Sequence, residues 1–217
     1  LSAAAFPQIV SSGPLGVAGR AGPNERIVTG HIGVGGRGGG NMRDVMRHQA
    51  SGVTKVVAVC DVDAKRCERA QRTVGDGTAR YHDYRALLER KDIDAVVIST
   101  PDHWHATQVV HAAEMGKHIY VEKPACCTIE EGKAMRAAVH KNNVACQVGS
   151  QGRSQPECHA ARTYIANGMI GTVRKVTCWH YPSPADNRPL PDSAPPPELD
   201  WDMWLGPAPM RPYNSVL

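Results

Sequence analysis

A glycine-rich stretch, "HIGVGGRGGG", is the first place where residue types and spacing indicate chemistry. It carries G-x-G-x-x-G at Gly33, Gly35 and Gly38, directly after an apolar run. Gly33 permits a tight turn, Gly35 lets the backbone approach a pyrophosphate, and Gly38 lets helix and strand pack closely. Amides of the helix N-terminus then face the phosphates. In this strand–turn–helix context the pattern predicts a dinucleotide site that also includes Val34, Gly36 and Arg37.

An acidic residue at the end of the second apolar run refines this prediction. Asp61 lies about 20 residues beyond the glycines, where a carboxylate bonds the ribose hydroxyls of a dinucleotide. A carboxylate there repels a 2′-phosphate, so we expect NAD rather than NADP. Lys65 and Arg66 could favour the phosphate, but at a helix start they are more often solvated surface. A turn or N-cap role for Asp61 is the alternative interpretation.

Two later loops carry the other chemically interesting residues. "STPDHWHA" (Ser99–Ala106) and "VEKPA" (Val121–Ala125) each follow an apolar run of strand length. In doubly wound sheets, ligands bind beyond the carboxyl ends of the strands. Both loops should therefore border the nicotinamide end of a dinucleotide. A partly desolvated Lys123 there would hydrogen-bond a substrate hydroxyl and favour developing negative charge; a capped strand end is the alternative.

The elements that must position these loops alternate regularly from Arg26 to Gly149. Nearly continuous apolar strands alternating with helices indicate a parallel sheet covered on both faces, that is, a doubly wound α/β Rossmann domain over residues 26–149. Strands are expected at Arg26–Ile32, Val53–Cys60, Ala79–Tyr81, Ala95–Ser99, His118–Val121 and Val144–Val148. Helices are expected near 39–50, 63–74, 83–91, 105–116 and 128–142.

The two ends of the chain have a different character. Residues 1–25 combine a short apolar run with small residues, Gly and Pro, as in the latter part of an export signal; a disordered leader is the alternative. After Gly149 we expect a helix at Ser154–Asn167 and a strand at Thr172–Tyr181. One helix and one strand cannot bury a core, so residues 150–217 are interpreted as the incomplete start of an α+β substrate domain.

Composition excludes several classes of protein. Hydrophobic residues make up 41% and charged residues 21%, and the net charge of +4 is scattered rather than concentrated, which argues against a nucleic-acid partner. Apolar runs are too short for a membrane-spanning helix. The seven cysteines show no CxxC or Cys/His ligand spacing, so neither a disulfide framework nor a metal site is expected.

The ordered motifs resemble the glucose–fructose oxidoreductase, inositol dehydrogenase and MocA (Gfo/Idh/MocA) family. The matching stretches are "GVGGRG", "AVCDVD", "STPDHWHA", "AAEMGKHIYVEKP" and "WDMWLGPAP", spread from about Arg26 to Leu217. The resemblance implies that Lys123 is the catalytic lysine, next to the nicotinamide and the substrate. It also implies that Glu122 lies at the cofactor and that Pro124 follows a cis bond.

The resemblance assigns further residues to the cofactor site. His105 matches a histidine that contacts the cofactor, whereas His103 is as compatible with packing. Ser99, Thr100 and Pro101 would line the nicotinamide end of the site. Gln151 and Arg153, in "GSQGRS", match a segment that passes near the nicotinamide. Three aromatic residues are candidates for a sugar-binding face or for ordinary packing: Trp201, Trp204 and Tyr213.

The family's general base does not match any residue of this chain. The resemblance implies a histidine in a later D-x-x-x-H helix, so we expect the natural chain to continue past Leu217 and these 217 residues alone to be inactive. Transfer of a hydride from a hydroxyl needs a group that takes the proton. The resemblance also implies homo-oligomers that associate through the substrate-domain sheet.

The sequence therefore predicts an exported, periplasmic NAD-dependent oxidoreductase that transfers a hydride between the nicotinamide and a sugar, polyol or related carbohydrate. Two alternatives stay open. An NAD-dependent glycoside hydrolase of the same family is disfavoured by Lys123, which that group tends to lose. A non-catalytic dinucleotide-binding module is favoured if the natural chain ends at Leu217.

Overall fold

The computed structural model describes residues 25–179 and 190–215. These residues form two compact units. The first contains the chain up to Val148 together with Pro196–Met210, and the second contains Gly149–Pro195 with Arg211–Leu217. The expected leader, residues 1–25, lies outside the described residues except for Glu25.

The first unit is built on one six-stranded sheet with the strand order β3-β2-β1-β4-β5-β6. The registered pairs β1–β2, β1–β4, β2–β3 and β4–β5 are all parallel. The chain thus extends the sheet in one direction from β1 and then in the other, which is the doubly wound arrangement that the sequence predicts. The strands are β1 (Ile27–Ile32), β2 (Thr54–Cys60), β3 (Ala79–Tyr81), β4 (Ala95–Ile98), β5 (His118–Glu122) and β6 (Cys146–Gly149).

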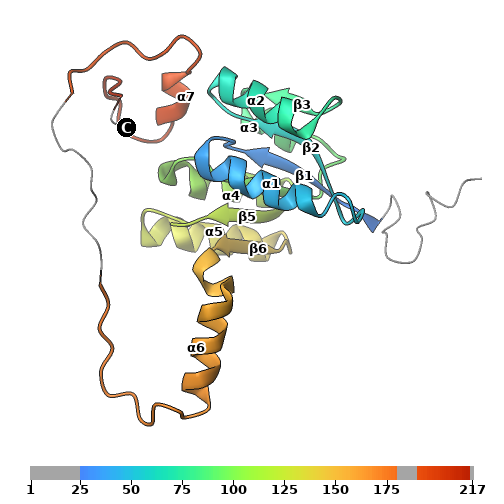
Figure 1. Cartoon of the computed structure of the whole chain (residues 1–217). Coiled ribbons are helices and arrows are strands. Elements are labelled where there is room, and N and C mark those ends of the chain that lie inside the picture. The colour runs from blue at the N-terminus through green and yellow to red at the C-terminus, as the bar shows by residue number, and fades with distance from the viewer. Residues whose placement is uncertain (1–24, 180–189, 216–217) are drawn as a thin grey trace, which may run out of the picture. The chain divides into compact units, whose positions relative to one another are not determined.

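Helices cover both faces of this sheet (Figure 1). Apolar residues of the helices α1 (Gly36–Arg47) and α2 (Ala64–Val74) form one buried cluster with β2. The larger cluster on the opposite face joins the central strands to the helices α3 (Tyr84–Leu88), α4 (Asp102–Glu114) and α5 (Ile129–Lys141). Burial on both faces explains why the strands are almost continuously apolar.

Two helices begin earlier than the sequence predicts, and both changes bring the helix closer to the functional loops. The helix expected from residue 39 begins at Gly36, within the glycine-rich stretch. The helix expected from residue 105 begins at Asp102, directly after Pro101. Proline tolerates a helix start because its missing N–H is not needed there. Each loop is therefore shorter, and the first helical turn itself borders the candidate site.

The segment Pro196–Met210 belongs to the same compact unit as the Rossmann sheet. Its short helix α7 (Trp201–Leu205) follows two backbone hydrogen bonds to the loop after β2: Ala64 N–H donates to Glu198, and Asp200 N–H donates to Val62. These bonds fix the segment to the sheet edge that carries the functional loops. The division of the chain into domains at residue 150 stays a prediction.

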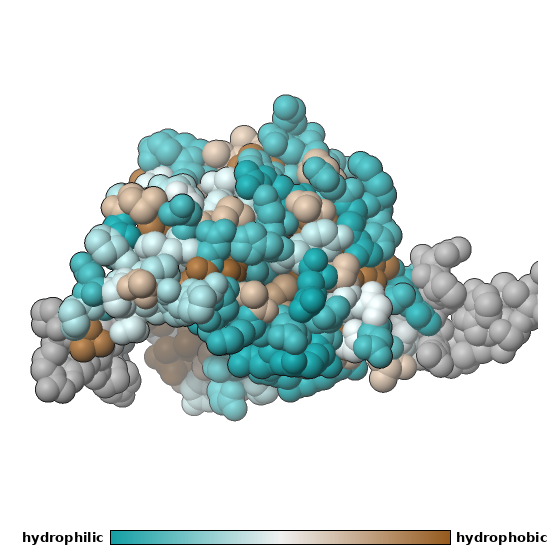
Figure 2. Space-filling view, turned by 90° about the horizontal axis from the view of Figure 1, so that it is seen from above, coloured by the Kyte–Doolittle hydropathy of each residue, from teal (hydrophilic) through white to brown (hydrophobic). Residues whose placement is uncertain are grey.

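The second unit contains the 3₁₀ turn η3 (Gln151–Ser154) and the helix α6 (Pro156–Ala166). The strand expected at Thr172–Tyr181 is not formed over residues 172–179, and residues 180 and 181 lie outside the described part. A strand needs a neighbour that takes its backbone hydrogen bonds, and the described residues supply none here. Figure 2 shows one face of the molecule, on which hydrophilic residues predominate.

Among residues 25–179 and 190–215, no helix combines the length and apolar character needed to cross a membrane. The same residues contain no group of three or more His, Cys, Asp or Glu side chains placed to hold a metal ion.

Candidate cofactor and active site

The glycine-rich loop leaves no room for side chains at its two tightest points. Gly33 has φ +78°, and a Cβ there would lie 2.7 Å from the backbone carbonyl carbon of Ser99. A Cβ on Gly38 would overlap the carbonyl oxygen of Gly33. Helix α1 starts directly behind this turn, with Gly35 at the N-cap and no capping side chain from the described residues. The first-turn amides are therefore available to an anion such as a pyrophosphate.

Asp61 supports the glycine-rich loop from the end of β2. Its Oδ2 accepts a hydrogen bond from the backbone N–H of Val34 at 2.9 Å, and its Oδ1 accepts one from Asp63 N–H at 3.0 Å. Burial raises the pKa of Asp61, against the lowering effect of these two hydrogen bonds. Each carboxylate oxygen has a second lone pair, so the bonds within the protein leave acceptor capacity for a ribose hydroxyl. That contact stays a prediction.

Glu122 is the centre of a hydrogen-bond network that joins three motifs. Its Oε1 accepts from Arg37 Nε at 2.9 Å and from Asn41 Nδ2 at 3.0 Å. The same amide nitrogen of Asn41 donates to Ser99 Oγ at 3.0 Å. The other carboxylate oxygen, Oε2, accepts from the backbone N–H of Lys123 at 3.2 Å. The glycine-rich helix, the end of β4 and the end of β5 are therefore tied together.

The electrostatics of Glu122 follow from these contacts. Its side chain is only 5% exposed, and burial alone would raise its pKa. The hydrogen bonds from Asn41 and Arg37 outweigh that effect, so the pKa of Glu122 lies below its usual value. The buried carboxylate is thus held ionised by its partners, which is the condition under which a buried charge is tolerated.

Lys123 directly follows Glu122, and its backbone N–H belongs to this hydrogen-bond network. It is exposed, and the peptide bond that joins it to Pro124 is cis, as the resemblance implies. Its backbone is held by Glu122, whereas its side chain extends from the carboxyl end of β5. This is the edge of the sheet at which the glycine-rich loop also lies, because β1 and β5 both run parallel to β4.

His105 joins the two loops that follow β4 and β5. The imidazole is 1% exposed, its Nδ1 lies 2.7 Å from the carbonyl oxygen of Pro124, and its Nε2 lies 2.9 Å from that of Thr100. A neutral imidazole carries one N–H and donates to one of these oxygens, whereas an imidazolium donates to both. The contact of His105 with the cofactor stays a prediction, since the described contacts of its ring nitrogens are made inside the protein.

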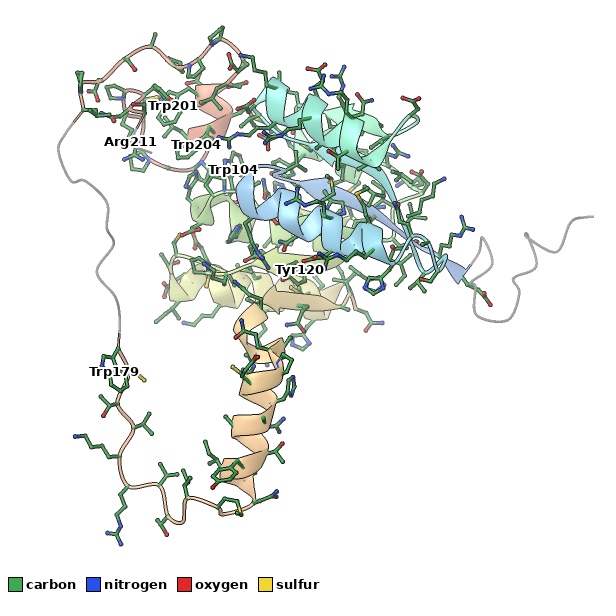
Figure 3. All side chains as sticks on the ribbon, in the orientation of Figure 1. Trp104, Tyr120, Trp179, Trp201, Trp204 and Arg211 are labelled. Atoms are coloured by element: carbon green, nitrogen blue, oxygen red, sulfur yellow. The ribbon has the colours of Figure 1, made fainter. Side chains whose placement is uncertain are left out.

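His103 and the neighbouring Trp104 bind the returning segment Pro196–Met210. His103 Nε2 lies 2.9 Å from the carbonyl oxygen of Trp204, and Trp104 Nε1 donates to the carbonyl oxygens of Met203 and Trp204 at 3.0 and 3.1 Å. Trp204 also stacks on Trp201 with 4.8 Å between ring centroids, close to Trp104 in Figure 3. These contacts favour the packing interpretation of His103 that the sequence left open.

The remaining predicted residues divide between the two units. Thr100 Oγ1 bonds Gln108 inside α4, and Pro101 precedes that helix. Gln151 and Arg153 belong to the second unit, where both are exposed in η3. Their contact with the nicotinamide stays a prediction. Sequence reasoning missed Asn41, because an asparagine within a helix has no motif of its own.

These residues fit a dinucleotide. The turn at Gly33 and Gly38 would be blocked by any side chain, the start of α1 is uncapped, and an acid ends β2. Glycine-rich turn, helix N-terminus and parallel sheet together define a dinucleotide-binding Rossmann domain. Residues 27–150 match the family described as "Oxidoreductase family, NAD-binding Rossmann fold", and residues 159–216 match "Oxidoreductase family, C-terminal alpha/beta domain".

The chain belongs to the Gfo/Idh/MocA oxidoreductase family, whose first domain binds NAD. It is 39% identical over 117 residues to scyllo-inositol 2-dehydrogenase (NAD(+)) of Bacillus subtilis, covering 54% of this chain and 34% of that protein. It is 43% identical over 91 residues to levoglucosan dehydrogenase of Pseudarthrobacter phenanthrenivorans, covering 42% of this chain and 23% of that protein. The matched part thus spans 34% and 23% of the length of these relatives.

A solved structure shares the fold and was determined with ligands. The scyllo-inositol dehydrogenase of Lactobacillus casei, crystallised with NAD(H) and scyllo-inositol, superposes with a TM-score of 0.62 at 25% identity. The match covers 67% of this chain and 42% of that one. Both the family and the cofactor predicted from the sequence are therefore confirmed.

Proposed function

We propose that the protein of which these residues form part is an NAD-dependent dehydrogenase that oxidises a hydroxyl group of a sugar or polyol. The observation that carries the proposal is the position of Lys123. It is exposed at the carboxyl end of β5, and its backbone is fixed by Glu122, which in turn is bonded to Arg37 at the start of the glycine-rich helix. The names of the two similar dehydrogenases support a carbohydrate substrate.

The roles of the chain's own residues follow from their positions. The uncapped start of α1 and the turn at Gly33 bind the pyrophosphate, and Asp61 bonds the ribose hydroxyls. When bound, NAD supplies a nicotinamide carbon that accepts a hydride. Lys123 donates a hydrogen bond to the substrate hydroxyl oxygen and stabilises the negative charge that develops there as the C–H bond breaks. The hydroxyl proton goes to a general base, a role that the resemblance assigns to none of the described residues.

The proposal is tested by incubating the full gene product with NAD and a panel of sugars, inositols and anhydrosugars. We expect NADH to accumulate with at least one of them, and Lys123→Met to lower kcat by about 10²- to 10³-fold, the usual effect of removing one such donor. NAD affinity, measured by calorimetry, should stay within about threefold in the variant, because other residues hold the cofactor. Normal kcat in Lys123→Met would contradict the proposal.

The same assay separates the alternative functions. An NAD-dependent glycoside hydrolase would cleave a glycoside without net release of NADH. A non-catalytic binding module would bind NAD by calorimetry and turn over none of the compounds. Accumulation of NADH at a rate that depends on Lys123 is the outcome that only the dehydrogenase predicts.

We further propose that the protein is exported. The support is the run "LSAAAFPQIV" followed by small residues, Gly and Pro. The test is to express the full gene in its own host and to determine the N-terminus and the cell fraction of the mature protein. A cytoplasmic protein that retains these residues would contradict export.

A further inference from the structure

Asn41 occupies a position where its residue type is unfavourable. It lies in the interior of α1, and asparagine is a weak helix former because its side chain competes for backbone hydrogen bonds. Its side chain is also buried, with 6% of the residue exposed, and a buried amide needs partners. Leucine or alanine would satisfy both the helix and the core more readily. The contacts of its amide group explain the choice.

The amide nitrogen of Asn41 has two N–H groups and two acceptors. Ser99 Oγ and Glu122 Oε1 both lie 3.0 Å from Nδ2. Ser99 directly follows β4, and Glu122 is the last residue of the adjacent strand β5; they lie 58 and 81 positions away from Asn41 in the chain. Asn41 therefore holds together the ends of two strands and the helix that starts at the glycine-rich loop.

The connection continues to Lys123. Glu122 Oε2 accepts a hydrogen bond from the backbone N–H of Lys123 at 3.2 Å. The carboxylate that Asn41 orients therefore also restrains the backbone of Lys123. Removing the Asn41 donor would leave the Glu122 carboxylate with Arg37, whose side chain is 46% exposed and therefore less restrained, and with Tyr120. The carboxylate would then be held less firmly, and the constraint on Lys123 would weaken.

We propose that Asn41 is a positioning residue for Lys123. It sets the orientation of Glu122 and so fixes the position of the Lys123 backbone relative to the glycine-rich helix, whose N-terminus faces the pyrophosphate of the cofactor. Displacement of a reacting group by about 1 Å can lower a rate by roughly 10²-fold, so this constraint has a measurable effect. The inference rests on the proposed catalytic role of Lys123.

The first test is a double-mutant cycle in the full gene product. Asn41→Leu keeps the branching at Cγ and removes both donors, and it is combined with Lys123→Met. We expect Asn41→Leu alone to lower kcat by about 10- to 100-fold, and to lower it by less than about threefold when Lys123 is already absent, because coupled residues are not additive. Equal factors in the two backgrounds would overturn the inference and leave Asn41 a purely structural residue.

The second test does not depend on activity. Hydrogen exchange of the Lys123 amide, measured without cofactor, reports the bond to Glu122 directly. Asn41→Leu should speed that exchange by about tenfold or more, relative to amides elsewhere in the sheet. Unchanged exchange at Lys123 would overturn the inference. Gly40→Ala is the matched control on the same helix, since a Cβ there meets nothing within 4 Å, and it should change neither quantity.

The outcomes separate this inference from the proposed function. If Lys123→Met alone leaves kcat unchanged, the proposed role of Lys123 fails. The exchange experiment still tests whether Asn41 restrains the Lys123 backbone through Glu122. If Asn41→Leu does not fold, Asn41→Ser takes its place: its shorter hydroxyl cannot bridge both acceptors and should give a smaller change of the same kind. Absence of any change in the folded serine variant would overturn the inference as well.

Discussion

Arg37 Nε and Glu122 Oε1 lie 2.9 Å apart although 85 positions separate the two residues in the chain. The pair connects the first turn of the glycine-rich helix to the last residue of β5. Its two ends differ in environment, because the Arg37 side chain is 46% exposed and the Glu122 side chain 5%. The arginine thus reaches from the surface to a carboxylate that the fold has buried.

Replacement of Arg37 by methionine tests the contribution of this pair to stability. The pKa of Glu122 is lowered in the folded protein, so its partners contribute stability that is present at neutral pH and is lost as the pH falls through the carboxyl range. We expect Arg37→Met to lower the free energy of unfolding at pH 7 by about 1–2 kcal/mol. Urea unfolding between pH 3.5 and 7 should show a flatter pH dependence in the variant; an identical dependence would contradict this account.

The carboxylate of Asp61 should determine the choice between NAD and NADP. Asp61→Asn keeps an acceptor for the Val34 amide but removes the charge that repels a 2′-phosphate. We expect the NADP dissociation constant, divided by the NAD dissociation constant, to fall by about tenfold. This change corresponds to roughly 1.4 kcal/mol in favour of NADP. Calorimetric titration of both cofactors measures it. Asp61→Ala should in addition weaken NAD itself, and an unchanged ratio in both variants would refute the assignment.

Gly206 is required for the packing of the segment Pro196–Met210. It has φ +48°, and a Cβ there would overlap the indole ring of Trp104. Gly206→Ala should therefore weaken the docking of α7 and speed proteolysis within this segment by about tenfold or more. Gly116→Ala is the control, since Gly116 has φ +70° but a Cβ there meets nothing within 4 Å. Equal effects of the two substitutions would assign the change to backbone strain alone.

His31 should make the stability of the Rossmann domain depend on pH. It is 1% exposed, its Nδ1 has no partner among the described residues, and desolvation lowers its pKa from 6.5 to about 4. The fold accepts only the neutral imidazole, so the folded protein has its full stability above pH 6.5. The free energy of unfolding then decreases as the pH falls from 6.5 towards 4. We expect a loss of about 2 kcal/mol between pH 7.5 and 5, which His31→Leu should abolish.

The measurement is chemical denaturation at those two pH values. His48→Gln, which replaces an exposed histidine in the turn after α1, is the matched control and should keep the full pH dependence of the parent protein. If His31→Leu kept it as well, the titrating group would be a different one.

The sequence was sufficient for the fold and for the cofactor loop because both depend on local patterns. Apolar runs of strand length, helices between them and the glycines of "GVGGRG" act through neighbouring residues, so the doubly wound parallel sheet and the turn at Gly33 agree with expectation. The ends of elements were less accurate. Helix α1 starts at Gly36 rather than near residue 39, since glycine gives a poor helix signal even where the backbone is helical.

Relationships across long distances in the chain could not be predicted in this way. The amide of Asn41 finds its partners only when β4 and β5 have assembled beside α1. The motif left His103 open between the cofactor and packing, and its Nε2 lies 2.9 Å from the carbonyl oxygen of Trp204, about 100 residues later, which no local pattern reveals. The strand expected at Thr172–Tyr181 shows the reverse case: residues 172–179 have the right alternation but no partner strand in the described chain.

The most direct test of the central claim is a crystal structure of the full gene product with NAD and a polyol that it oxidises. We expect Lys123 Nζ to lie within about 3.2 Å of the hydroxyl oxygen whose carbon faces the nicotinamide. A Lys123 side chain directed away from the substrate, with another group bonded to that oxygen, would contradict it.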